Sequence, residues 1–122
     1  MTRSVLVKKQ KTKRKNEFQG RSRITWMGQW DQEYVDEDVE GYFKFGTGGN
    51  GDFQFGYVQG SMDYRTTVRG GKPTTEFSWE GGDAADGTPL TGRGWAALEG
   101  EELTGMIHIH FGDESQFTAR KT

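Results

Sequence analysis

The two histidines of the chain, His108 and His110, lie at positions i and i+2 of an apolar, β-prone stretch. Alternate side chains of a strand point to one face, so both imidazoles should lie opposite Ile107, Ile109 and Phe111. Rings about 7 Å apart could ligate one metal ion, given a third ligand from a neighbouring strand. The candidates for that ligand are Asp113, Glu114, Glu76 and Glu80. Because the spacing matches no familiar zinc signature, no metal site is predicted, and a metal-dependent enzyme using both histidines is a second alternative.

Further polar side chains lie between large apolar residues in the segments that precede the histidines. In one interpretation they form the solvated outside of a β-sheet, because an alternating sheet normally has one wet face. In the other, inside and outside are reversed for part of the wall, so that these side chains line a pocket in which Trp95 is a stacking platform for a small polar or aromatic ligand. The ligand-binding residues predicted on this second interpretation are Arg65, Glu76, Arg93, Trp95, His108 and His110.

Signatures of catalysis do not accompany these residues. The sequence contains no nucleophile elbow, phosphate loop or zincin helix, and Ser78 and Ser115 have no activating neighbours in a known motif. A carboxylate such as Glu76 or Glu80 beside His108 could support acid–base chemistry, so an enzyme stays open. We predict no catalytic residue and no cofactor, and we favour a non-enzymatic protein.

The stretch from Gly41 to Glu80 must supply the scaffold for this face. It reads as four short strands joined by glycine turns, one of them expected at Gln59 and Gly60, with large side chains at every second position. A period of two places these side chains on one face of a sheet, which we interpret as the core. They are Phe43 and Phe45; Phe53, Phe55 and Tyr57; Met62, Tyr64, Thr66 and Val68; and Thr75, Phe77 and Trp79.

Four more strands complete the expected fold. The first places Ile24, Trp26, Gly28 and Trp30 on one face, and a helical turn capped by Asp31 should follow it. The last three are expected at residues 91–98, 103–111 and 116–120, after a polar loop at 81–89. Sequential hairpins predict an all-β, eight-stranded antiparallel up-and-down barrel or rolled meander, because closure removes exposed edges.

Charge divides the chain into two parts. Residues 1–23 carry nine basic side chains against Glu17, a net charge of +8, whereas the remaining residues carry a net charge of −10. We predict a flexible basic N-terminal arm at 1–22 and a single barrel domain at 23–122. The arm is either a solubilising tail or a contact for nucleic acid or an acidic partner. Its candidate residues are Lys8, Lys9, Lys11, Lys13, Arg14 and Lys15.

Composition indicates the cellular compartment in which the protein is expected. The chain has no cysteine and therefore no disulfide framework, which fits a reducing compartment. No apolar run reaches the roughly 18 residues of a membrane span, and the N-terminus lacks the apolar middle of a signal peptide. We expect a cytoplasmic protein without a membrane partner.

Three segments resemble small uncharacterised bacterial proteins that contain an aromatic, glycine-punctuated β domain. The segments are GDFQFG at 51–56, EFSWEG at 76–81 and GRGWA at 92–96. A second similarity is to the calycin, or lipocalin-like, barrels, whose first strand carries the G-x-W motif found here at 28–30. This resemblance implies an eight-stranded barrel in which Arg120 stacks on Trp30, and neither resemblance implies an activity.

The function predicted from the sequence is a non-enzymatic binding module for an unknown small ligand or protein partner. The loop at 81–89 would lie at the entrance of the barrel. If aromatic rings fill the interior, the function must lie on the surface, and the alternative is a protein or nucleic-acid interaction through the basic arm.

Overall fold

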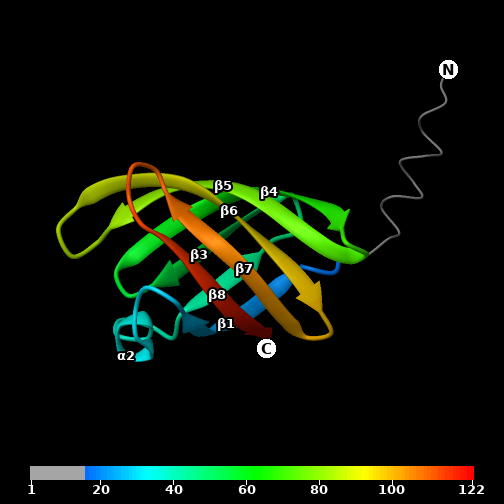
Figure 1. Ribbon diagram of the computed structural model, residues 1–122. Helices are drawn as coiled ribbons and strands as arrows, with labels where there is room; N and C mark the ends of the chain where they lie inside the picture. Colours follow the sequence, from blue (N-terminus) through cyan, green and yellow to red (C-terminus); the bar gives the residue numbers. More distant parts are fainter. Residues whose placement is uncertain (1–15) are drawn as a thin grey trace, which may run out of the picture.

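The computed structural model describes residues 16–122, which form a closed barrel of eight antiparallel strands in sequence order (Figure 1). This confirms the predicted all-β, up-and-down barrel. The strands are β1 (Gly20–Met27), β2 (Tyr42–Phe45), β3 (Asn50–Phe55), β4 (Val58–Arg69), β5 (Lys72–Asp83), β6 (Thr88–Glu99), β7 (Glu102–Ile109) and β8 (Glu114–Lys121). A short helix, α2 (Gln32–Val35), lies between β1 and β2. No helix within the described range is long and apolar enough to cross a membrane.

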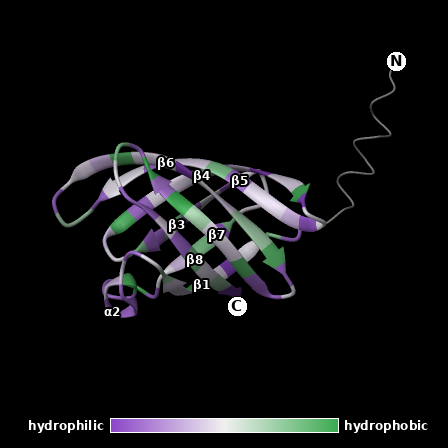
Figure 2. Cartoon of the chain, viewed as in Figure 1, coloured by the Kyte–Doolittle hydropathy of each residue, from purple (hydrophilic) through white to green (hydrophobic). Residues whose placement is uncertain are grey.

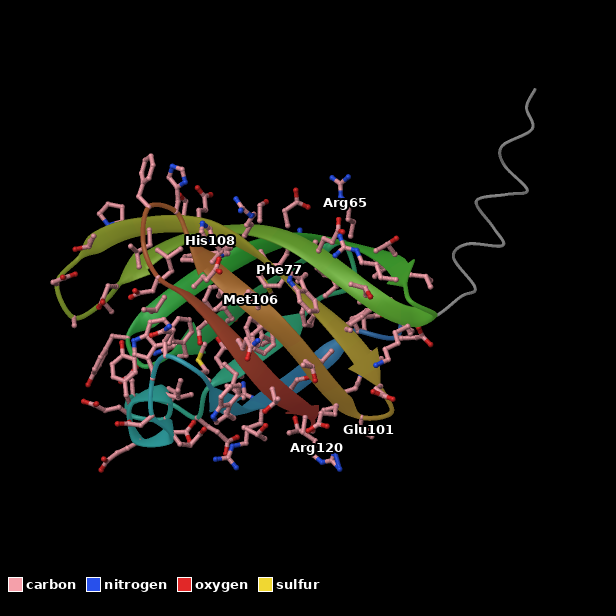
Figure 3. The ribbon with its side chains drawn as sticks, viewed as in Figure 1. Arg65, Phe77, Glu101, Met106, His108 and Arg120 are labelled. Atoms are coloured by element: carbon pink, nitrogen blue, oxygen red, sulfur yellow. The ribbon has the colours of Figure 1, made fainter. Side chains whose placement is uncertain are left out.

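Aromatic rings fill the middle of the barrel. Phe43 is fully buried, and the centroid of its ring lies 4.5 Å from that of Phe117, 5.4 Å from that of Phe53 and 6.1 Å from that of Phe77. Figure 3 shows Phe77 pointing into the space between the walls. Hydrophobic and hydrophilic residues alternate along the strands (Figure 2), as the period-two pattern predicts. The few apolar residues of this chain therefore meet in one core.

Inward-facing glycines make room for these rings. Each of four large rings lies directly across from a glycine of the adjacent strand: Phe53 from Gly60, Phe77 from Gly94, Trp79 from Gly92 and Phe117 from Gly105. A Cβ atom at Gly60 would lie 2.5 Å from the ring of Phe53, closer than real Cβ contacts allow. Glycine is needed at these positions to make room for a ring, and not to form a turn.

Two breaks predicted at glycines are consequently wrong. Gly60 lies inside β4, and the chain turns earlier, at Gly56 and Tyr57. Strand β5 continues through Gly81 and Gly82 to Asp83, and only residues 84–87 join it to β6. The backbone of Gly81 faces Gln59 so closely that a Cβ would collide with the Gln59 carbonyl. Here glycine permits close approach of two strands rather than a turn.

Residues before and after β1 cover the two ends of the barrel. At one end, Phe18 is buried and its ring meets Phe45 edge-on at 5.9 Å, while Asn16 donates a hydrogen bond of 2.8 Å to the Tyr64 hydroxyl. At the other end, the Trp30 ring lies 4.8 Å from that of Phe55. The barrel thus includes residues from 16 onward, although the sequence pattern placed its start at residue 23.

Helix α2 holds Trp30, which covers the second end of the barrel, in place. The Asp31 side chain accepts a hydrogen bond of 2.9 Å from the Tyr34 backbone N–H, which confirms the predicted N-cap. Val35 is fully buried below the helix, and Tyr34 packs beside Trp30. The helix is short because Asp36 accepts from Gly41, which returns the chain toward β2.

Trp26, Thr66 and Val68 were predicted in the core but point into solvent. Trp26 is 47% exposed because the register of β1 against β8 shifts between Ile24 and Trp26, and this bulge turns the indole outward. Val68 is 67% exposed and Thr66 is also exposed, because the β4–β5 hairpin extends past the end of the packed interior. Alternation predicts on which face of a strand a side chain lies. At Thr66 and Val68, however, the inward face of the hairpin has no opposite wall to contact.

Candidate ligand-binding surface on the barrel wall

The six predicted ligand-binding residues lie on the outside of the barrel, five of them on β4 to β7 and His110 directly after β7. Two cross-strand rows contain five of them. One row consists of Asp63, Ser78, Arg93, His108 and Glu114, and the next consists of Arg65, Glu76, Trp95 and Met106. His110 belongs to a third row, in which its backbone N–H donates to Thr91 at 2.8 Å. Figure 3 shows Arg65 directed away from the interior. Their outward direction agrees with the interpretation as a solvated face. The interpretation in which part of the wall is reversed is wrong, because Phe77, Trp79 and Ile107 occupy the interior.

Two shallow grooves nevertheless run across this outer wall and bring the six residues together. The histidine groove, with a volume of about 550 Å³, is lined by side chains that include Arg93, His108 and His110. The tryptophan groove, with a volume of about 420 Å³, is lined by Arg65, Glu76, Arg93 and Trp95 among others. Arg93 lies in both grooves, so the two form one continuous surface around its guanidinium group.

Charges on this surface balance. Three acidic and three basic side chains line the two grooves: Asp63, Glu76 and Glu80, and Arg65, Arg69 and Arg93. Arg69 and Glu76 form an ion pair. Within residues 16–122, the guanidinium groups of Arg65 and Arg93 take part in no ion pair or hydrogen bond. These two groups are therefore available as donors to a ligand.

Trp95 supplies the aromatic surface of the tryptophan groove. Its side chain is 37% exposed and lies between Glu76 and Met106 in the register of the sheet. Trp95 points outward because Gly94 and Ala96, on either side of it, face the core. An exposed indole held on the middle of a sheet is a rigid contact surface.

The histidines differ in their surroundings. His108 is partly buried, and its Nδ1 lies 3.1 Å from a carboxylate oxygen of Glu114 on β8. His110 is exposed, and its ring centroid lies 4.1 Å from that of Phe111. Both side chains face the histidine groove, as the i, i+2 spacing predicts.

Phe111 is a further residue of this region that the sequence pattern missed. It was expected in the core beside Ile109, but β7 ends at Ile109 and the phenyl ring is 96% exposed. The Gly112 N–H donates to the Ile109 carbonyl at 2.8 Å, so the turn begins two residues earlier than predicted. Phe111 has φ of 60°, a left-handed conformation that bulky residues rarely adopt. The glycine at 112 was the available signal for this turn.

A metal site at the histidines receives no support from the geometry. In the part of the chain from residue 16 to residue 122, no three His, Cys, Asp or Glu side chains are grouped so that they could hold a metal ion. Glu114, one of the ligands considered for such a site, is paired with His108.

No family model, curated protein or solved structure matches this chain. The resemblance of the three glycine-rich segments to small bacterial proteins therefore stays a prediction. The eight-stranded barrel agrees with the architecture that the calycin resemblance implies.

The calycin resemblance implied that Arg120 stacks on Trp30, and this detail is wrong. Arg120 lies opposite Arg23 and Glu102 near the end of β8, and its side chain points outward. Trp30 packs on Phe55 and Tyr34 beside α2 instead. The cation–π contact in the described part of the chain joins Arg21 and the Tyr42 ring, at 4.3 Å.

The predicted basic contact residues lie outside the described range. They are Lys8, Lys9, Lys11, Lys13, Arg14 and Lys15. Two other basic residues of this segment belong to the barrel: Arg21 covers Tyr42, and Arg23 pairs with Asp36 and Glu40. The positive charge that is left for a partner is therefore concentrated before residue 16.

Proposed function

We propose that this protein is a non-enzymatic binding module that holds a small polar ligand on the outer wall of β4 to β7. The observation that carries the proposal is the position of Arg93. Its guanidinium group has no partner among the described residues and lies in both grooves, between Trp95 on one side and the histidines on the other. A convergent set of donors, acceptors and one aromatic ring is typical of a binding site.

The packing of the interior supports a site on the wall. Phe43, Phe53 and Phe55 are almost completely buried, and the ring of Phe53 packs against the other two. The barrel ends are covered by Phe18 and Trp30. A ligand inside the barrel would have to displace these rings, at a cost of several kcal/mol for each large core side chain. Binding on the wall requires no such displacement.

The openness of the wall also favours binding over catalysis. Both grooves lie on the outer surface, where water reaches the polar groups. Electrostatic catalysis is strongest in sites that exclude water. His108 and Glu114 could exchange a proton, but among residues 16–122 both side chains stay open to solvent, 26% and 58% exposed.

A ligand panel tests this proposal. Amide spectra recorded by NMR with amino acids, mononucleotides, dicarboxylates and saccharides should reveal at least one compound that shifts the signals of Arg93, Trp95 and His108. Arg93→Met should weaken that binding about tenfold or more, since a hydrogen bond from a charged group contributes about 1.5–3 kcal/mol. Arg120→Met, which removes an exposed arginine elsewhere on the wall, should leave binding unchanged. Equal losses in both variants would contradict the proposal.

A second candidate function rests on the charge of the N-terminal segment. Nine basic residues against one acidic residue before position 24 favour contact with nucleic acid or an acidic partner. Deletion of residues 1–15 leaves Phe18 and β1 in place and should abolish retention on heparin at low salt. A truncated protein that elutes with the full chain would exclude this function.

A further inference from the structure

Aromatic rings lie at both ends of the surface that the two grooves form. Trp95 lies in one cross-strand row of the sheet. His110, whose ring packs on that of Phe111, lies two rows further along. Four strand residues separate these rows, a distance of about 13 Å at the usual rise per residue. An occupant that contacts both ends must therefore be elongated.

Hydrogen-bonding side chains fill the interval between the rings. The hydroxyl of Ser78 and the carboxylates of Asp63 and Glu80 accept, while Arg93 donates. Because the charges on this surface balance, a ligand with a large net charge of either sign gains little from it. Groups that both donate and accept, such as hydroxyls, match this mixture best.

The backbone contributes little to recognition here. Between the Trp95 row and the His110 row, β5, β6 and β7 are paired on both sides, so their N–H and C=O groups are already used in the ladder. An extended peptide usually binds a sheet by pairing with a free edge. Within residues 16–122, the stretch of β4 from Arg65 to Arg69 pairs with β5 alone, but it extends from the Trp95 row away from Phe111 and so lies outside this interval. Side chains alone must hold the occupant.

Phe111 is held in an unfavourable arrangement at one end of the surface. Its ring is almost completely exposed and its backbone is left-handed, and both features cost stability. No contact within the described barrel other than that with the His110 ring accounts for an aromatic side chain at this position. A ligand that packs on the ring would account for it.

We infer that the ligand is a neutral oligosaccharide that lies along the wall from Trp95 to Phe111, an inference that rests on the binding function proposed above. The flat apolar face of a sugar ring packs on the indole or the phenyl ring. The hydroxyls of the intervening units accept from Arg93 and donate to Asp63 and Glu80. No bond is made or broken.

Titration with defined saccharides tests the inference. The probes are cello-, malto-, xylo- and chito-oligosaccharides of one to six units. At least one series should bind with an affinity that rises with chain length. Trp95→Ala and Phe111→Asn should each lower the affinity of the longest member about tenfold, a loss typical of one aromatic contact. Asparagine is chosen because it tolerates a left-handed backbone.

Trp26→Ala provides the matched control. Trp26 is as exposed as Trp95 but lies on β1, away from both grooves, so its loss should leave saccharide affinity unchanged. Binding that does not depend on chain length, or that falls equally in all three variants, would overturn the inference.

Failure of this inference can be separated from failure of the proposed function. If a different compound of the ligand panel binds and depends on Arg93 while no saccharide series binds, the wall is a binding site and the oligosaccharide inference is wrong. Binding of an alternating glutamate–lysine peptide that strengthens with length, in place of the saccharides, would also overturn it.

Discussion

At the scale of single residues, Phe111 is a position at which the proposed ligand contact and the stability of the fold make opposite demands. A left-handed backbone costs a bulky residue about 1–2 kcal/mol relative to the ordinary helical region, whereas glycine adopts it freely. Phe111→Gly should therefore raise the free energy of unfolding by about 1 kcal/mol, measured by urea denaturation. Phe111→Ala retains the backbone penalty and should give no such gain. A destabilised glycine variant would show that the phenyl ring contributes to the fold.

A second residue, Tyr42, predicts how stability depends on alkaline pH. Burial, together with the hydrogen bond that its hydroxyl donates to Asp52 at 2.7 Å, raises the pKa of Tyr42 to about 12. A group whose pKa is raised on folding stabilises the protein below its unfolded pKa of about 10, and this contribution is lost between pH 10 and pH 12.

Absorbance of the phenolate in an alkaline titration should show one tyrosine that ionises near pH 12. Asp52→Asn removes the carboxylate and should lower the pKa of that tyrosine toward 10. An unchanged titration curve in the variant would mean that Asp52 has no part in the shift.

At the scale of elements, pairing of rings with glycines fixes how neighbouring strands pack. A methyl group at Gly60 would collide with the rings of Phe53 and Trp79, at 2.5 and 2.9 Å. Gly60→Ala should lower the free energy of unfolding by about 1–3 kcal/mol, as overpacking of a core does. Gly48→Ala is the control, because only the Asn50 side chain lies within 4 Å of the added atom. Equal stability of the two variants would contradict the packing account.

The sequence predicted the barrel because its period-two pattern is strong. Phe43, Phe53 and Phe77 all point inward as alternation requires, and successive short strands lead to sequential hairpins. The failures have local physical causes. Gly60 resembles a turn residue in sequence but is an interior packing position, and the bulge after Ile24 reverses the face of Trp26.

The candidate surface could be predicted only in part. Alternation places Arg65, Arg93 and His108 on one face, and the structure brings them onto one wall. Sequence spacing cannot show that this face is grooved, since the twist of four adjacent strands decides that. Nor could it place Phe111 at the edge of the surface, because this depends on where the β7–β8 turn begins.

At the scale of the whole molecule, the barrel is a filled scaffold, and the binding function that we propose lies on its exterior. Rings occupy the interior, Phe18 and Trp30 cover its two ends, and the longest strands, β4, β5 and β6, extend the wall beyond the core (Figure 1). Where these long strands pair with neighbours on both sides, they create a broad, rigid face. The barrel therefore supports recognition by side chains that project outward.

The most direct test of this account is a map of amide shifts in the 13.8 kDa protein, recorded by NMR with the oligosaccharide panel and, separately, with decanoate as a probe for an apolar interior. We predict saturable shifts on β4 to β7 around Arg93, Trp95 and His108 for a bound saccharide, and none for decanoate. Saturable shifts at the inward-facing residues Phe43 and Phe55 with either probe would contradict it.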